Sequence, residues 1–168
     1  MNGPSVRNPV VLFSMLALCG CDEVVRIRNL APEVSVVAVC PDPQGAVVWV
    51  DVADPELDPV DLGLSFGARP LRIGATEDGV IGLSPDRAAP GRRHRIRWAT
   101  EASEAASLCP TLDEPTRDTD CADARGVEAG ERVVLAVVAR DHAGVESGQG
   151  RPALVMGEGC ESLGEATP

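Results

Sequence analysis

The sequence RRHRIRWA at residues 92–99 gives the clearest indication of the fold, because its character alternates with a period of two. In an extended chain His94, Ile96 and Trp98 fall on one face, and the arginines between them fall on the other. Such alternation is typical of a strand with one face buried and one face in water. The stretch therefore predicts a half-buried β-strand with His94, Ile96 and Trp98 turned inward.

Six further stretches on either side show short runs of apolar and β-branched residues, separated by Gly, Pro and Asp. They are residues 33–39, 46–53, 61–66, 80–83, 131–140 and 152–156. About seven strands with turn signals between them predict an all-β fold, an antiparallel β-sandwich of two sheets. At most one short helix is expected, over residues 101–108, with Thr100 as its N-cap.

The stretch ERVVLAVVAR at residues 131–140 is apolar on both faces. One face is expected to pack on the core of the sandwich, which leaves a second apolar face on the outside. The pattern therefore predicts a central strand whose outer face is covered by further structure. The preceding residues 100–130 are expected to form a long loop, and loops of this length are typically functional or stapled.

Two motifs resemble those of bacterial Ig-like and cadherin-like repeats. The stretch VDVADPELDP at residues 50–59 is similar to their strand followed by a DPEGDP turn, with Leu57 where the family often has Gly. The stretch VVARDHAG at residues 137–144 is similar to their penultimate strand, which ends in Asp-x-x-Gly. The resemblance, which the opening NLAPEV at residues 29–34 extends, implies one Ig-like β-sandwich domain over residues 33–157 and a C-terminal tail at 158–168.

Composition limits the classes of function. The 168 residues include 15 arginines, no lysine and 26 acidic side chains, for a net charge of −11. Phosphate binding needs a concentrated basic surface, so nucleic acid is not expected as a partner. A hydrophobic content of 44% is normal for a globular chain, and the length favours a single folded domain.

Residues 1–20 have the features of a secretory signal peptide. Arg7 is followed by an uninterrupted apolar run at residues 9–18. A stable spanning helix needs about 20 apolar residues, so this run is too short to be a membrane anchor. The pattern predicts export of the chain from the cytoplasm.

The stretch LCGC at residues 18–21 resembles the lipobox of bacterial lipoproteins, with the small Gly20 directly before the cysteine. The resemblance implies that a diacylglyceryl group is attached to Cys21, that the signal peptide is removed before it, and that residues 21–32 form a lipidated N-terminus and a short tether. The partner is then a membrane, reached through the acyl chains. The expected location is the envelope of a Gram-negative-type bacterium, at the inner or outer membrane, with the domain outside the cytoplasm.

Four cysteines follow the lipobox: Cys40, Cys109, Cys121 and Cys160. An even number in an exported protein predicts disulfides, although four cysteines allow three pairings. Proximity in the sequence favours Cys109–Cys121, which would staple the long loop and leave Cys40–Cys160 as the second bond. Zinc is not expected, because there is no C-x-x-C and neither histidine lies near a cysteine.

Acidic side chains at the two Ig-like motifs could converge at one end of the sandwich. They are Asp51, Asp54, Glu56, Asp58 and Asp141. Calcium prefers six to eight oxygen ligands, and the resemblance to cadherin-like modules implies such a cluster. The alternative is that these aspartates shape turns by accepting backbone N–H bonds.

The remaining patterns do not point to chemistry. Arg92, Arg93, Arg95 and Arg97 could contact anionic head groups, but alternating arginines more often form a solvated face paired with acidic neighbours. No H-E-x-x-H, P-loop or dinucleotide fingerprint occurs, so neither catalysis nor a cofactor is expected. The sequence predicts a non-enzymatic, lipid-anchored envelope protein that binds or organises another envelope component. The alternatives are a calcium-responsive or glycan-binding adhesion module and, third, a hydrolase.

Overall fold

The computed structural model describes residues 28–74, 78–100, 109–113, 115–116, 121–125 and 127–163. Within these ranges the chain forms nine strands and one helical turn. They are β1 (Glu33–Asp42), β2 (Gly45–Ala53), β3 (Val60–Phe66), β4 (Arg69–Pro70), β5 (Arg92–Ala99), β6 (Cys109–Pro110), β7 (Pro115–Thr116), β8 (Arg132–Asp141), β9 (Ala153–Val155) and α1 (Cys160–Leu163).

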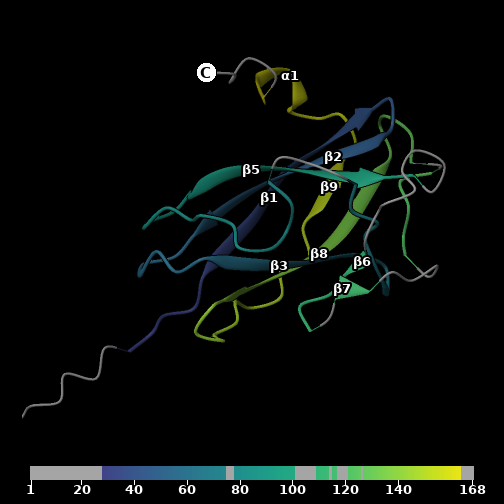
Figure 1. Cartoon of the computed structure of the whole chain (residues 1–168). Coiled ribbons are helices and arrows are strands. Elements are labelled where there is room, and N and C mark those ends of the chain that lie inside the picture. Colours follow the sequence, from purple (N-terminus) through teal and green to yellow (C-terminus); the bar gives the residue numbers. More distant parts are fainter. Residues whose placement is uncertain are drawn as a thin grey trace, which may run out of the picture.

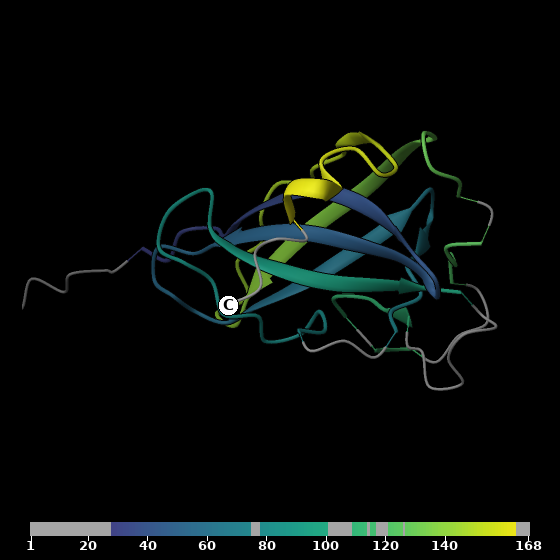
Figure 2. The same ribbon diagram turned by 90° about the horizontal axis from the view of Figure 1, so that it is seen from above.

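The long strands form two antiparallel sheets, a three-stranded sheet in the order β1-β2-β5 and a four-stranded sheet in the order β4-β3-β8-β9. The sheets form two layers (Figure 1), which the view from above in Figure 2 also shows. They enclose a common core that takes Ile96 and Trp98 from one sheet and Leu62 and Leu135 from the other, all buried. The expected all-β architecture of two packed antiparallel sheets is therefore confirmed.

Strand β5 has the orientation that its alternating sequence predicts. It pairs with β2 so that His94 lies opposite Val50 and Ile96 lies opposite Val48. These side chains are buried, whereas Arg93 and Arg95 are exposed on the outer face of the three-stranded sheet. Because the side-chain period of a strand is two, this register places every second residue of β5 in the core.

Strand β8 pairs with β3 on one side and with β9 on the other, so it is a central strand of its sheet. Val133, Leu135 and Val137 are at most 1% exposed and belong to the core. The alternate residues, Val134 and Ala136, point to the outer face of the sheet, where Val134 is 43% exposed. The prediction of a central strand with two apolar faces is confirmed.

The strand predicted at residues 80–83 is wrong. Leu83 forms only an isolated bridge to Val60, although Val80 and Leu83 are both buried in the core. Gly79 and Gly82 have φ angles of 63° and 67°, in the left-handed region that interrupts a strand. The apolar residues of this segment therefore fill the core from a loop.

Two expectations about helices have different outcomes. The helix predicted over residues 101–108 lies outside the described residues. A single helical turn, α1, forms instead in the C-terminal segment that was expected to be a tail. Its Leu163 is buried against Val47 and Ala38 on the outer face of the three-stranded sheet.

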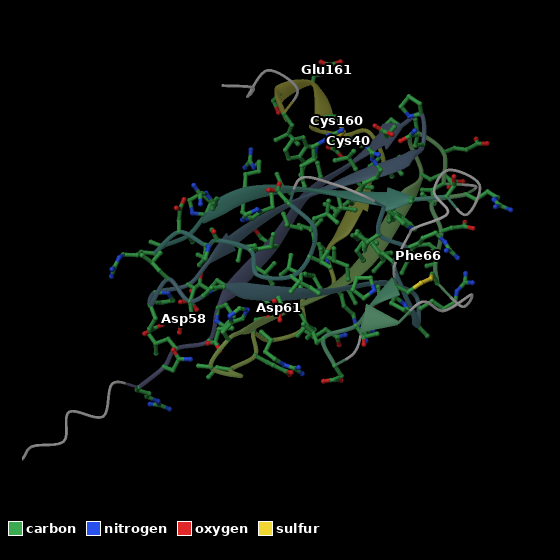
Figure 3. All side chains as sticks on the ribbon, viewed as in Figure 1. Cys40, Asp58, Asp61, Phe66, Cys160 and Glu161 are labelled. Atoms are coloured by element: carbon green, nitrogen blue, oxygen red, sulfur yellow. A yellow bond between two sulfur atoms is a disulfide. The ribbon has the colours of Figure 1, made fainter. Side chains whose placement is uncertain are left out.

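A disulfide between Cys40 and Cys160 fixes this C-terminal segment to β1, with the two Cα atoms 5.7 Å apart. Figure 3 shows the pair beside α1, above the three-stranded sheet. The amide of Gly157 also donates to the carbonyl of Val39 at 2.8 Å. The chain that leaves β9 is therefore held across the edge of the sandwich and onto the opposite sheet.

Candidate binding surface

The second disulfide joins Cys109 to Cys121, with Cα atoms 5.8 Å apart, as proximity in the sequence favours. After Cys121, the chain forms a bridge to the segment that follows β4. Ala122 donates its amide to the carbonyl of Pro70, and its own carbonyl accepts the amide of Arg72, both at 2.8 Å. The indole Nε1 of Trp98 donates to the same carbonyl at 2.8 Å. The end of the stapled loop is thus fixed to the core.

The beginning of the stapled loop covers part of the outer face of the four-stranded sheet. Leu112 lies over Gly63 of β3, where a Cβ atom would come within 3.1 Å of the Leu112 Cγ. Glycine at this position leaves room for the leucine. In Figure 1 the β6–β7 hairpin lies on the side of β3 and β8 that faces away from the other sheet. The expectation that further structure covers the outer face of β8 is confirmed for this half of the strand.

Arg140, at the end of β8, fastens this covering segment. Its Nη1 donates to the carbonyl of Leu112 at 2.9 Å, and its Nη2 donates to Asp113 at 3.0 Å. Its Nε donates to Glu146 at 2.8 Å. The hydrogen bonds to Glu146 and Asp113 raise the pKa of the Arg140 guanidinium above its ordinary value. The arginine therefore stays charged and ties the loop to the strand.

The other half of the outer face is an open groove of about 510 Å³. Its lining consists of Phe66, Gly67, Ala68, Arg69, Val134, Ala136 and Arg151. A smaller hollow of about 260 Å³ under Leu112 adjoins it, since Ala68 lines both. An apolar groove with a few polar groups at its rim is the usual form of a binding surface in a protein. We take this groove as the candidate site.

The arginines around the groove differ from those on the opposite sheet. On the three-stranded sheet, Arg93 donates to both oxygens of Asp51 at 2.8 and 2.9 Å, and Arg95 lies 3.8 Å from Asp42. At the groove, Arg69 has no hydrogen bond or ion pair in the described part of the chain, and Arg151 bonds there only to the amide oxygen of Gln149. Arg132, two residues before Val134 on β8, is also without a partner in these ranges. The rim of the groove therefore carries positive charge that no carboxylate of the described chain neutralises.

The alternating arginines of β5 are largely paired, as their commoner interpretation predicts. Arg97 donates to Gln44 at 2.9 Å, and the hydrogen bonds of Asp51 raise the pKa of Arg93. His94 is 5% exposed, with its Nε2 3.0 Å from the carbonyl of Ser84. His142 is exposed in the turn after β8. The arginines of β5 therefore form a structural surface of the three-stranded sheet.

Three of the carboxylates proposed for calcium, Asp51, Asp54 and Asp141, have hydrogen-bond donors within the chain. Asp51 holds Arg93 on the outer face of β2. Asp54 accepts the amides of Glu56 and Asp58 through its Oδ1, both at 3.0 Å, and so shapes the turn between β2 and β3. Asp141 accepts the amide of Val145 at 2.8 Å. Asp54 and Asp141 therefore have the turn-forming roles that were the alternative to calcium binding.

The structure does not gather these carboxylates into a calcium site. In the described ranges, no three His, Cys, Asp or Glu side chains are placed to hold one metal ion. Two carboxylate oxygens of the turn, Asp54 Oδ2 and Glu56 Oε2, are buried without a hydrogen-bond donor. Two oxygens fall well short of the six to eight that calcium takes.

Calcium is accordingly expected to leave the melting temperature unchanged. Asp54→Ala is expected to lower the free energy of unfolding by about 3 kcal/mol, equally in millimolar calcium and in chelator, because two amides lose a charged acceptor. Asp58→Ala is the matched control in the same turn, since its backbone amide still donates to Asp54. Urea unfolding in both conditions measures the effect. A calcium-dependent rise that Asp54→Ala abolishes would restore the calcium hypothesis.

The residues that form the groove were only partly indicated by the sequence. The second apolar face of β8 is visible in the alternation of residues 131–140. Arg69 and Arg151 were not predicted, because they reach the groove from a two-residue strand and from the segment before β9. Leu112, which lines the adjoining hollow from the stapled loop, was not predicted either. Gly63 within an otherwise apolar strand was the one signal that could have indicated a close approach there.

In the described ranges no helix is both long enough and apolar enough to cross a membrane. Comparison of the chain with protein-family models, with curated proteins and with solved structures finds no match.

Proposed function

We propose that the chain is a non-enzymatic, lipid-anchored protein of the cell envelope that acts as a binding or structural module through an Ig-like sandwich. The observation that carries the binding role is the open groove on the outer face of the four-stranded sheet. Val134 borders it, together with arginines that have no carboxylate partner among the described residues. Exposed apolar surface of this kind on a small domain is typical of a contact surface for another molecule.

The order of the strands supports the Ig-like identity. The first, second and fifth strands form one sheet, and β3, β8 and β9 lie in the other. The chain therefore changes sheets after β2, after β4 and after β5, which is the Greek-key type of connection found in Ig-like sandwiches. The turn at residues 54–59 and the Asp141–Gly144 turn, which carried the resemblance in the sequence, form two of the links at one end of the domain.

The position of the N-terminal segment supports the anchored arrangement. The side chain of Asn29 donates to Asp141 at 2.6 Å, which fixes the chain to the sandwich just before β1. The residue opposite Asp141 is Val60, at the beginning of β3, whereas the groove begins at Phe66, at the end of the same strand. Six residues of strand span about 20 Å. A chain tethered at Cys21 would hold the groove on the side away from the membrane.

Acyl labelling tests the anchor. The full chain is expressed in a bacterium with radiolabelled or alkyne-tagged palmitate, and the product is analysed by intact mass. The wild type and Cys19→Ala are expected to lose residues 1–20, to take up label and to sediment with membranes, whereas Cys21→Ala takes up none. A wild type that keeps its first twenty residues and remains unlabelled would overturn the anchored location. That result would leave the groove untouched as a binding surface.

A further inference from the structure

We infer that the groove binds an extended peptide segment of another protein, in which aliphatic side chains alternate with carboxylates. The inference rests on the proposed function as a binding module and names the partner chemistry of its groove. The floor of the groove is apolar. Val134 is 43% exposed and Ala136 lies beside it at i+2, so the outer face of β8 presents methyl groups in a row.

Strand β9 extends this apolar floor sideways. Val155 pairs with Arg132, Ala153 pairs with Val134, and Val155 is 39% exposed. Residues directly opposite in an antiparallel pair share a face, so Val155 and Ala153 lie on the same outer face as Val134. Two large aliphatic side chains, both more than a third exposed, thus lie on neighbouring strands with no described part of the chain covering them.

The rim of the groove is positively charged. Arg69 on β4, Arg132 on β8 and Arg151 before β9 surround the floor, and none is paired with a carboxylate in the described ranges. The chain has 26 acidic side chains for 15 arginines, so acidic partners are abundant elsewhere in the molecule. Arg93 and Arg140 have taken such partners. A guanidinium recognises a carboxylate by paired N–H donors, and charge complementarity therefore favours an acidic ligand.

The shape of the site favours an extended chain. From Arg132 to Ala136, β8 rises by about 13 Å at the usual 3.3 Å per residue, which matches four residues of an extended peptide. Such a peptide places alternate side chains on opposite faces. Aliphatic side chains could then rest on Val134 and Ala136 while the carboxylates between them reach the arginines at the rim.

The location of the groove favours a protein over a lipid as the source of the carboxylates and apolar groups. The groove lies at the Phe66 end of β3, and Figure 3 shows Phe66 and Asp58 at opposite ends of the domain. The described chain begins at the Asp58 end, where Asn29 binds Asp141. With the acyl anchor at that end, the groove faces away from the membrane and toward other components of the envelope.

A peptide array tests the inference. Immobilised hexapeptides in which Val, Leu or Ile alternates with Asp or Glu are compared with isosteric peptides carrying Asn or Gln. The purified full chain, kept in a neutral detergent, is expected to bind the acidic set at least tenfold more tightly than the neutral set. The acyl anchor plays no part in the binding of the peptides. A failure of the chain to bind the peptides can therefore be distinguished from a failure of lipidation.

Variants locate the binding. Arg69→Gln and Arg151→Gln are each expected to weaken the binding of the best acidic peptide by about tenfold. Val134→Asp is expected to weaken this binding more, since the new carboxylate repels the acidic ligand and removes an apolar side chain from the floor. Arg92→Gln is the matched control, because Arg92 is an exposed arginine on the opposite sheet. Circular dichroism confirms that each variant is folded.

Four results would overturn the inference. They are equal binding of the neutral peptides, unchanged affinity in both arginine variants, retention of the chain by phosphatidylglycerol vesicles but by no peptide, and a self-association in sedimentation that Val134→Asp abolishes. The third result would assign the groove to a lipid surface, and the fourth would assign it to a second copy of this chain.

Discussion

Replacing Cys40 and Cys160 together by alanine is expected to lower the free energy of unfolding by about 5 kcal/mol. The bond closes a loop with a sequence separation of 120, and the chain-entropy estimate of its stabilisation grows with the logarithm of that length. In the native state the bond holds α1 on the three-stranded sheet, where Leu163 is buried beside Val47. Its removal raises the conformational entropy of the unfolded chain and releases the C-terminal segment in the native state.

The second disulfide is the matched control for this prediction. Cys109 and Cys121 are separated by only 12 residues, so replacing both by alanine is expected to cost about 3 kcal/mol on the same estimate. Urea unfolding followed by circular dichroism measures both pairs against the oxidised wild type. If removing the Cys109–Cys121 disulfide lowers the free energy of unfolding as much as removing the Cys40–Cys160 disulfide, loop closure does not account for the stabilisation. Local packing around each disulfide would then have to account for it.

The two sheets were predictable because their strands obey a simple period. In β5 the alternation of His94, Ile96 and Trp98 with arginines determines which face is buried, and the structure places all three inside. In β8 the second apolar face indicated that further structure lies over the sheet. Leu112 of the stapled loop lies over Gly63 of the neighbouring strand β3 and lines one hollow with Val138 of β8. A period of two is visible in neighbouring residues alone, so it predicts the buried face of a strand without knowledge of the tertiary fold.

The groove was not predictable for a reason that is also physical. Arg69 lies in a two-residue strand, Arg151 in the segment before β9, and neither has a periodic pattern around it. Their convergence depends on how β4 pairs with β3 and how β9 pairs with β8, which are contacts between distant parts of the chain. The sequence could show that β8 had an apolar outer face, but it could not show which segments would border that face.

At the turn residues, the resemblance and the local chemistry favoured different roles. Asp54 and Asp141 were expected either to converge on calcium or to shape turns. In the structure Asp54 accepts the amides of Glu56 and Asp58, and Asp141 accepts that of Val145. Each bond joins residues two or four apart, so the turn-forming interpretation needed no tertiary information and was the stronger one.

Trp98→Ala is expected to lower the free energy of unfolding by about 4 kcal/mol. The indole is fully buried between the sheets, lies 5.5 Å from the ring of Phe66, and donates to the carbonyl of Ala122. Truncation to alanine leaves a cavity and removes these contacts together, and cavities of this kind typically cost about 3–5 kcal/mol. The Ala122 carbonyl still accepts the amide of Arg72, so the lost indole bond adds little beyond the cavity.

The side chain of Trp98 also connects the core to the groove, because Phe66 contacts it on one side and borders the groove on the other. Trp98→Phe keeps a ring in the core and is expected to cost only about 1–2 kcal/mol, mainly from the lost volume. Trp49→Ala is the matched control, since Trp49 is half-buried beside α1 on the outer face of the three-stranded sheet, to which Trp98 also belongs. Thermal unfolding followed by far-ultraviolet circular dichroism should rank the losses as Trp98→Ala above Trp49→Ala and Trp98→Phe. A Trp98→Ala loss no larger than that of Trp49→Ala would contradict the position of Trp98 as the centre of the core.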